Sequence, residues 1–281
     1  MDFIRSAIER ARRERGRSRG MTPETRVELP AAKIADTKPT AQRSELWATL
    51  PEFLPNAKHL ERNLIVTHRA GPDAAHFDMI RTRLLHQMRA NDWRRVAITS
   101  PGSACGKSTV AVNLAFSMAR QPDLFTFLAE LDLRRPSVAK FLGVKEPRQF
   151  ARVLAMQDEP ESEMLRIGGN LAVAVNSRPA EGAAEILQAK AAGHAMDAIE
   201  ARFMPDIVVC DMPPMLLCDD TLAFLDQIDC ALLVAAAERT SMDEIERCSA
   251  DLAGRTNFLG VILNKCRYLE RSESYGYGYG Y

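Results

Sequence analysis

A glycine-rich segment at residues 100–109, SPGSACGKST, carries residue types whose spacing suits phosphate binding. Gly102 and Gly106 allow the backbone to wrap around an anion, Lys107 adds a positive charge, and the Ser108 hydroxyl can bind Mg²⁺. The usual Gly-x-x-x-x-Gly-Lys-Ser/Thr pattern has a glycine where this chain has Pro101. The alternative is a glycine-rich turn that binds no ligand. The predicted nucleotide-binding residues of the loop are Gly102, Ser103, Ala104, Cys105, Gly106, Lys107, Ser108 and Thr109.

Acidic residues follow two apolar segments further along the chain. Asp211 closes the apolar run in DIVVCDMPP, while Glu130 and Asp132 close the run in FLAELDLRRP, just before Arg134 and Arg135. A buried carboxylate needs a cation, so Asp211 is expected to hold a Mg²⁺-bound water beside the phosphate loop. The spacing of two predicts that Glu130 and Asp132 face the same side of one strand. Each acid taken alone could instead be a solvated strand end.

The segments around these residues predict alternating strands and helices. Near-continuous apolar runs are typical of parallel strands that are covered on both faces. The expected strands are 94–100, 124–133, 170–177, 206–212, 230–237 and 258–265, and the helices between them include 108–120 and 241–253. The sequence therefore predicts an α/β fold, a doubly wound, mostly parallel sheet with helices on both faces. Ligands of such sheets bind at the carboxyl ends of the strands.

The composition excludes several classes of protein. Of the 281 residues, 46% are hydrophobic, and basic and acidic residues number 37 each, so no global charge favours nucleic acid. The six cysteines show no metal-site or disulfide spacing, which indicates buried thiols in a reducing cytosol. No apolar run approaches 18 residues, and the N-terminus lacks a signal-peptide core. We therefore expect neither a membrane span nor export.

Three zones are expected along the chain. Residues 1–45 have too few apolar residues to bury and predict a flexible basic arm, 46–268 carry the fold, and 269–281 form a Tyr/Gly-rich tail. Within the arm, five apolar residues are spaced so that they would lie on one face of a helix: Phe3, Ile4, Ala7, Ile8 and Ala11. A short amphipathic helix could therefore form on a partner or on an anionic membrane surface. A solvated arm with no target is the alternative.

All five tyrosines of the chain lie in its last 14 residues, at Tyr268, Tyr275, Tyr277, Tyr279 and Tyr281. Glycine between the last four removes side-chain packing and helix propensity, so a flexible tail exposes phenols at close intervals. Such a tail has a root-mean-square span of about 20 Å, enough to enter a neighbouring subunit's active site. The last four tyrosines are the predicted phosphoacceptors. The alternative is an aromatic tail that binds a partner by stacking.

The order of these motifs resembles the bacterial tyrosine autokinases known as BY-kinases, whose nucleotide-binding fold is similar to that of MinD/ParA-type P-loop ATPases. The resemblance covers roughly residues 75–281. It rests on SPGSACGKST, FLAELDLRRP, DIVVCDMPP and LGVILNK, followed by the tyrosine cluster. It implies an ATP- and Mg²⁺-dependent kinase that phosphorylates its own tail.

The resemblance also implies roles for individual residues of this chain. Lys107 would contact the ATP phosphates. Ser108, Asp132 and Asp211 would organise Mg²⁺ directly or through water, and Asp132 would also help to activate the incoming tyrosine. The predicted catalytic residues are thus Lys107, Asp132 and Asp211, and the predicted metal residues are Ser108, Asp132 and Asp211. The resemblance also implies that Asp220 lies near the metal and that Asn264 contacts the adenine.

The chain departs from the patterns of these families in three respects. Glu130 stands where the family has the first aspartate of an Asp-x-Asp pair. The glutamate side chain is one methylene longer than that aspartate. Of a family E-x-x-R-x-x-R pattern used in ring assembly, Ala75, Asp78 and Arg81 keep only the last residue. Gly102 stands where MinD and ParA relatives have a signature lysine, which favours the kinase branch.

The resemblance also implies partners and a process. We expect a membrane-bound polysaccharide co-polymerase as activator, homo-oligomers in which a tail enters a neighbour, and a cytoplasmic protein recruited to the inner face of the plasma membrane. The expected process is control of exopolysaccharide or capsule synthesis and export. Two alternatives remain open: a MinD/ParA-like positioning ATPase without tyrosine kinase activity, and a nucleotide-dependent scaffold with weak catalysis.

Overall fold

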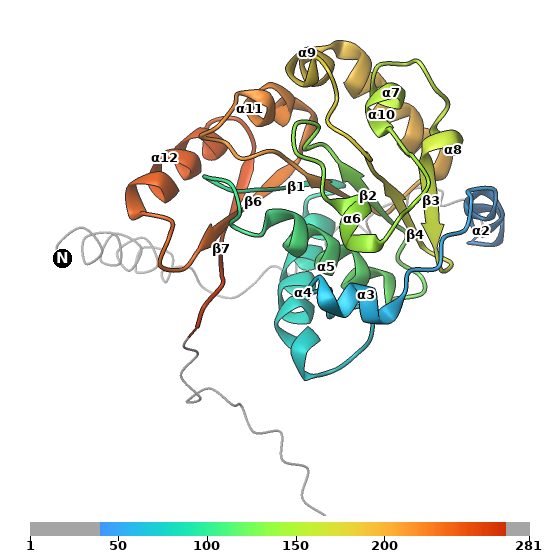
Figure 1. Ribbon diagram of the computed structural model, residues 1–281, viewed down its shortest axis with the longest axis horizontal. Helices are drawn as coiled ribbons and strands as arrows, with labels where there is room; N and C mark the ends of the chain where they lie inside the picture. The colour runs from blue at the N-terminus through green and yellow to red at the C-terminus, as the bar shows by residue number, and fades with distance from the viewer. Residues whose placement is uncertain (1–39, 268–281) are drawn as a thin grey trace, which may run out of the picture. The chain divides into compact units, whose positions relative to one another are not determined.

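The computed structural model describes residues 40–267, which contain a seven-stranded sheet in the order β3-β4-β2-β5-β1-β6-β7 (Figure 1). All neighbouring strands are parallel except β3 and β4, which pair antiparallel. The strands are β1 Arg95–Thr99, β2 Thr126–Glu130, β3 Met164–Ile167, β4 Leu171–Ala174, β5 Ile207–Asp211, β6 Cys230–Ala236 and β7 Asn257–Asn264. The predicted α/β, mostly parallel sheet is confirmed.

The sheet contains one strand that the sequence analysis did not predict. The six predicted strands are all present, but β3, with the sequence MLRI, is an additional edge strand. It is only four residues long and carries a charged Arg166, so it lacks the apolar run that identified the others. Edge strands are often short and charged because these features discourage pairing with other chains.

Helices cover both faces of the sheet (Figure 1). The helices before and within the first half are α2 Thr40–Ala48, α3 Ala57–Arg62, α4 Ala75–Ala90, α5 Lys107–Ala119, α6 Val138–Leu142, α7 Phe150–Leu154 and α8 Pro160–Glu163. Those that follow are α9 Ala183–Gln188, α10 Lys190–Phe203, α11 Asp220–Phe224 and α12 Met242–Ala253. Two short 3₁₀ turns are η1 Pro72–Ala74 and η2 Leu225–Gln227.

The alternation of side chains along each strand divides the core into two clusters. In β1, Val96 and Ile98 pack on the face covered by α3 to α6, whereas Ala97 packs on the opposite face with α7 and α9 to α12. Burial on both faces explains why the central strands are continuously apolar. The result is a rigid platform whose strand ends hold the candidate site.

Helix α2 crosses the expected domain boundary at residue 45. Trp47 is fully buried, its Nε1 donates a hydrogen bond of 2.7 Å to the Phe203 carbonyl, and its ring meets Phe125 edge-on at 4.9 Å. Arg43 lies over the Phe125 ring and pairs with Asp206. Residues 42–45, which the sequence analysis assigns to the arm, therefore belong to the packed fold.

The rest of the predicted arm, including Phe3, Ile4, Ala7, Ile8 and Ala11, lies outside the described residues. So do the predicted phosphoacceptors Tyr275, Tyr277, Tyr279 and Tyr281. Within residues 40–267, no helix combines the length and apolar character needed to cross a bilayer.

Candidate active site

The predicted phosphate loop joins β1 to α5. β1 ends at Thr99, and α5 begins at Lys107, directly after Gly106. Gly106 has a φ of 96°, in the left-handed region, and a Cβ placed there would lie 2.2 Å from the Asn264 side-chain nitrogen. Both the backbone conformation and the close approach therefore require glycine. Ala104 also has a positive φ, of 59°, so the loop is tightly curled.

Asn264, at the end of β7, closes one side of this loop. Its Nδ2 donates a hydrogen bond of 2.9 Å to the carbonyl of Cys105. Residues 159 positions apart in the sequence are thus in direct contact. Asn264 therefore lies against the phosphate loop, and its expected contact with adenine stays a prediction.

Lys107 lies between the two acids that the sequence analysis singled out. Its Nζ lies 2.8 Å from Asp132 Oδ2, 3.1 Å from Asp211 Oδ1 and 3.1 Å from Ser108 Oγ. All four residues are buried. The sheet register explains the convergence, because Ile98 of β1 and Glu130 of β2 both align with Asp211 of β5. The carboxyl ends of three adjacent strands therefore meet at the phosphate loop.

Burial and charge compete at this cluster. Burial disfavours the charged form of Lys107, but the charges of Asp211 and Asp132 outweigh it and raise the Lys107 pKa above its ordinary value. Burial raises the pKa of Asp211, against the opposing effect of Lys107. One lysine thus compensates two carboxylates.

The residues of this cluster fit a magnesium ion. Asp211 Oδ2 is buried and, within the described part of the chain, has no hydrogen-bond partner. An unsatisfied buried carboxylate oxygen is costly, and Mg²⁺ prefers oxygen ligands, often one or two carboxylates with waters and substrate phosphates. Asp211, Asp132 and the Ser108 hydroxyl supply such a donor set.

Glu130 forms no hydrogen bond or ion pair with Lys107, Asp132 or Asp211 in the described part of the chain, although it lies at the same strand end. Strand β2 ends at Glu130, and the chain then turns so that the Leu133 N–H bonds the Leu131 carbonyl. Ala129, Leu131 and Leu133 nevertheless pack in the same core cluster, so the alternation of side chains continues beyond the last strand residue, in agreement with the prediction that Glu130 and Asp132 face the same side.

The Glu130 carboxylate instead caps a loop. It accepts backbone N–H hydrogen bonds of 2.6 Å from Ser137, 2.7 Å from Val138 and 2.7 Å from Asn176. Burial raises the Glu130 pKa to about 7, although these N–H donors favour the charged form. Glu130 thus holds the segment that follows Asp132 against β4.

Asp220 is fixed by an arginine from the same rim. It is 1% exposed, and its two oxygens accept hydrogen bonds from Arg134 Nε at 2.6 Å and Nη2 at 3.0 Å. This pair raises the pKa of Arg134. Asp220 was expected near the metal on the basis of the family resemblance. In the structure its contacts are with Arg134, and no sequence pattern indicates this pair because the two residues are 86 positions apart.

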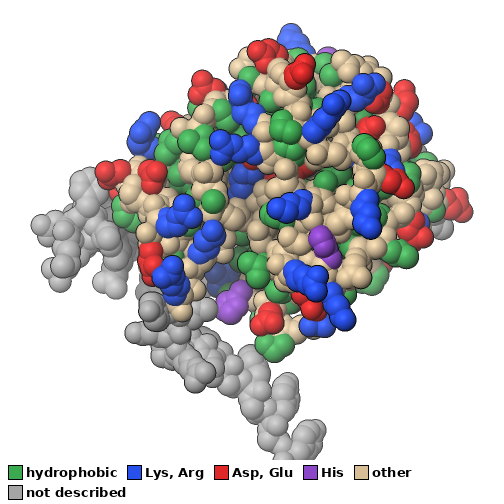
Figure 2. Space-filling model, in the orientation of Figure 1, with side chains coloured by type: hydrophobic (Ala, Val, Ile, Leu, Met, Phe, Trp, Pro, Cys, Tyr) green, Lys and Arg blue, Asp and Glu red, His purple; other side chains and the backbone are tan. Residues whose placement is uncertain are grey.

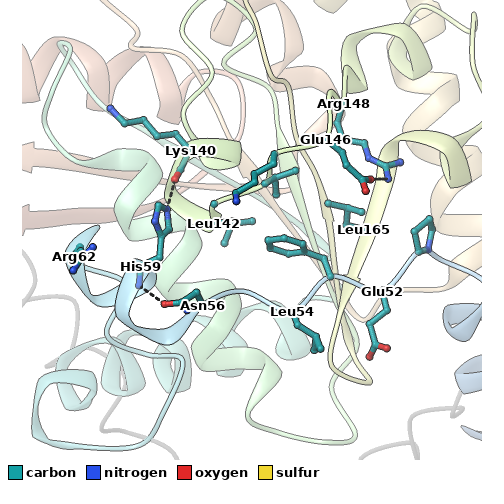
Figure 3. Close-up of a pocket in the computed structure, with 15 residues that line it drawn as sticks. Glu52, Leu54, Asn56, His59, Arg62, Lys140, Leu142, Glu146, Arg148 and Leu165 are labelled. Carbon is teal, nitrogen blue, oxygen red and sulfur yellow. Dashed lines mark hydrogen bonds and ion pairs between the residues drawn. The ribbon is translucent and has the colours of Figure 1, made fainter.

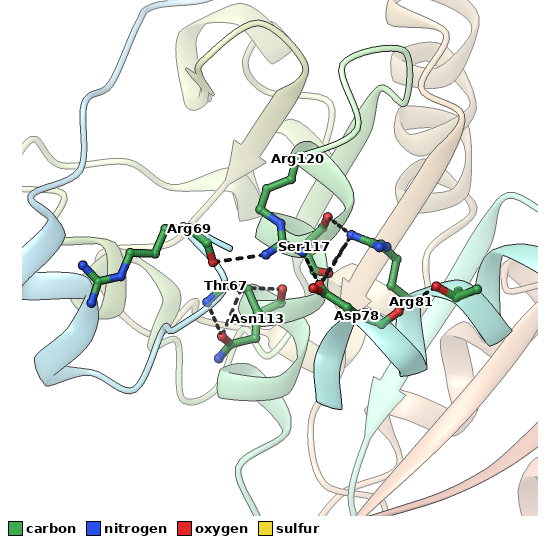
Figure 4. Close-up of polar contacts among 8 residues, drawn as sticks. Thr67, Arg69, Asp78, Arg81, Asn113, Ser117 and Arg120 are labelled. Carbon is green, nitrogen blue, oxygen red and sulfur yellow. Dashed lines mark hydrogen bonds and ion pairs between the residues drawn. The ribbon is translucent and has the colours of Figure 1, made fainter. Parts of the chain in front are cut away.

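The departures from the family ring pattern have a local explanation (Figure 4). Asp78 of α4 accepts a hydrogen bond of 2.6 Å from the Ser117 hydroxyl and pairs with Arg120. Arg81 donates to the Ser117 carbonyl at 2.8 Å. Asp78 and Arg81 therefore join α4 to α5 within one chain, and Ala75 has no polar side chain to contribute.

Comparison with known proteins identifies related sequences. Residues 96–275 match a family model described as the CobQ/CobB/MinD/ParA nucleotide binding domain. The chain is 28% identical over 221 residues to the tyrosine-protein kinase YwqD of Bacillus subtilis, covering 78% of this chain and 92% of that protein. It is also 22% identical over 206 residues to a putative tyrosine-protein kinase, CapB, of Staphylococcus aureus.

Solved structures share the fold. The kinase domain of the Escherichia coli tyrosine kinase ETK has a TM-score of 0.64 at 24% identity, covering 73% of this chain and 80% of that chain. The chimerical protein CapA2B2 has a TM-score of 0.65 at 21% identity, covering 81% and 99%. A cobyrinic acid a,c-diamide synthase from Mycobacterium smegmatis with a bound ATP analog and magnesium has a TM-score of 0.51 at 18% identity, covering 61% and 74%. At these identities, each likeness shows the fold alone.

Proposed function

This chain belongs to the CobQ/CobB/MinD/ParA nucleotide-binding domain family, and we propose that it is an ATP-dependent protein-tyrosine kinase that phosphorylates its own C-terminal tyrosines. The observation that carries the proposal is the contact of Lys107 with Asp132 and Asp211 beside the phosphate loop. The tyrosine-rich end of the chain supplies the acceptors. The similarity to proteins named tyrosine-protein kinases supports this reading over the alternatives.

The proposed nucleotide site is the loop from Gly102 to Thr109, with Asn264 beside it. Backbone N–H groups at the start of α5 favour a phosphate through their partial positive charge. Lys107 would turn from the carboxylates toward the phosphates, leaving Asp132 and Asp211 to hold Mg²⁺ with Ser108. The metal, when bound, neutralises charge that develops on the transferred phosphoryl group.

In the proposed reaction, a tyrosine oxygen bonds to the γ-phosphorus of ATP as the bond from that phosphorus to the departing ADP oxygen breaks. The phenol has an ordinary pKa near 10, so a base must take its proton. We propose that Asp132 takes this role. One of its oxygens lies by Lys107, and the other accepts the Arg135 N–H at 3.1 Å. The Arg135 N–H would keep the carboxylate oriented once Lys107 has turned toward the phosphates.

The proposed acceptors are Tyr275, Tyr277, Tyr279 and Tyr281, reached by a tail from a neighbouring subunit in a homo-oligomer. The proposed activator is a cytoplasmic segment of a membrane-bound polysaccharide co-polymerase, as the family resemblance implies. Such a partner would recruit the chain to the inner face of the plasma membrane and connect its activity to exopolysaccharide or capsule export.

Incubation with γ-labelled ATP and Mg²⁺ tests the proposal. We expect label on the full chain, and no label on a chain that lacks residues 268–281 or carries Lys107→Ala. ATP hydrolysis without protein labelling would favour a MinD/ParA-like positioning ATPase, and nucleotide binding without turnover would favour a scaffold. Either of those results would contradict the kinase assignment.

A further inference from the structure

A second hollow lies away from the nucleotide site, between the segment 51–62, which includes α3, and the segment 140–148, which includes the end of α6 (Figure 3). It has a volume of about 900 Å³, within the usual range for ligand sites. None of Lys107, Asp132 or Asp211 lines it. We call it the α3–α6 groove.

The floor of the α3–α6 groove is apolar. Leu142 and Leu165 lie at its base and are buried, while Leu54 at its edge is 78% exposed. This is the largest exposed fraction among the large apolar side chains of the described residues. An apolar floor and an exposed leucine together indicate a surface that binds apolar or aromatic groups.

The charges around the α3–α6 groove are unbalanced. Both acids that line it are already paired, Glu146 with Arg148 at 3.0 Å and Glu52 with Arg166 at 3.3 Å. Three cations, Arg62, Lys140 and Lys145, are exposed at the rim, and no ion pair to them is found among the described residues. Lysines and arginines gather on this face of the molecule (Figure 2). The groove therefore suits a ligand that combines negative charge with aromatic or apolar groups.

We propose that the α3–α6 groove binds the C-terminal tail of this chain once its tyrosines are phosphorylated. The proposal rests on the proposed function for the existence of the phosphorylated tail. Each phosphotyrosine joins an aromatic ring to a charge of about −1.5 to −2, so two of them carry about −3 to −4 against the three rim cations. In an extended chain, alternate residues face the same side about 7 Å apart, and the tyrosines alternate with glycine. Neighbouring phenols can thus enter one groove together.

The tail is long enough to reach over the surface of the domain. The described chain ends at residue 267, and Tyr281 lies 14 residues beyond. Fully extended, those residues span up to about 50 Å. An anionic membrane is the other occupant that matches the charge. The peptide is favoured because Leu142 and Leu165 lie at the bottom of a hollow, where an inserted side chain reaches them and a flat bilayer does not.

Binding of a synthetic peptide tests this proposal independently of kinase activity. The probe is a fluorescent peptide of residues 271–281 with four phosphotyrosines, titrated without ATP onto the full chain in which Tyr275, Tyr277, Tyr279 and Tyr281 are replaced by phenylalanine, so that its own tail stays unmodified. We expect fluorescence anisotropy to show binding that is at least tenfold tighter than for the unphosphorylated peptide. A matched phosphoserine peptide should also bind more weakly, because it lacks the rings.

Substitutions locate the site. Arg62→Glu with Lys145→Glu should weaken binding of the phosphotyrosine peptide at least tenfold, whereas Lys190→Glu, an exposed cation outside the groove, should leave it unchanged. Thermal unfolding should be the same for all variants, since these side chains are exposed. The proposal would be overturned if the Arg62/Lys145 variant bound the phosphotyrosine peptide as tightly as the parent, or if binding did not depend on phosphorylation. It would also be overturned if anionic vesicles, instead of the peptide, bound in a way that depends on the groove. Failure of the kinase itself would appear only in the assay with labelled ATP.

Discussion

Lys107 has a structural task as well as a proposed catalytic one, because it compensates the charges of Asp132 and Asp211. Removing it leaves two buried carboxylates facing each other. Removing one partner of a buried ion pair costs about 3–5 kcal/mol. We therefore expect Lys107→Met to lower the free energy of unfolding by about that amount, measured by urea denaturation without nucleotide at neutral pH.

Pairing that change with a second one separates stability from activity. Adding Asp211→Asn to Lys107→Met removes one of the two facing charges, so most of the stability should return while tyrosine phosphorylation stays absent. If Lys107→Met unfolds as easily as the parent chain, the lysine does not compensate the two acids.

Asp132→Asn is expected to change activity strongly and stability only a little. Lys107 keeps its pair with Asp211, so the free energy of unfolding should fall much less than in Lys107→Met. The proposed proton acceptor is lost, and a general base contributes about 10²- to 10⁴-fold to rate. The rate of tail phosphorylation, measured with anti-phosphotyrosine detection at saturating ATP, should fall at least 100-fold. A variant with near-normal rate would show that another group takes the proton.

The raised pKa of Glu130 predicts that the free energy of unfolding depends on pH. Its pKa is about 7 in the folded chain, and 4.5 is the ordinary value. Between these values the folded state holds more protons than the unfolded state, so this group's contribution to stability decreases as pH rises from about 4.5 to 7. The decrease is on the order of 3 kcal/mol. Urea unfolding of the parent chain and of Glu130→Gln should be compared between pH 4.5 and 7. The free energy of unfolding should fall less with pH in the variant, and the same fall in both would contradict the raised pKa of Glu130.

At the scale of elements, the phosphate loop depends on two features of Gly106, its left-handed backbone and its close approach to Asn264 of β7. Gly106→Ala should displace Asn264 and distort the loop, so we expect ATP affinity, measured by isothermal titration calorimetry, to fall at least tenfold. Gly169→Ala is the matched control, because Gly169 lies outside the loop and a Cβ there meets nothing within 4 Å. Equal effects of the two substitutions would argue against a requirement specific to Gly106.

Elements that bury continuous apolar runs could be predicted from the sequence, and those fixed by a few polar contacts could not. The central strands and α5 follow from their apolar residues, and the meeting of Asp132 and Asp211 follows from the rule that parallel strands end at one edge. The edge strand β3 lacks such a run. The loop cap by Glu130 and the pair of Arg134 with Asp220 depend on which groups the loops after the strands bring within reach, and an apolar pattern carries no information on that.

At the scale of the whole molecule, α2 sets the extent of the domain. Trp47 joins it to Phe125 and Phe203, and replacing a buried tryptophan by alanine costs about 3–5 kcal/mol. We expect Trp47→Ala to reduce the free energy of unfolding by this amount, measured by chemical denaturation. A chain that begins at residue 49 should be destabilised at least as much, and a chain that begins at residue 38 should match the full protein. Full stability without α2 would place the boundary beyond residue 48.

The proposed kinase combines a nucleotide site at the strand ends, a tail that receives phosphate and a groove that holds the tail afterward. Phosphate transfer to the tail is tested most directly by mapping phosphate on the full chain by mass spectrometry after incubation with ATP and Mg²⁺. We predict phosphate on Tyr275, Tyr277, Tyr279 and Tyr281, and none when all four are replaced by phenylalanine. ATP turnover with these four tyrosines unmodified would contradict the claim.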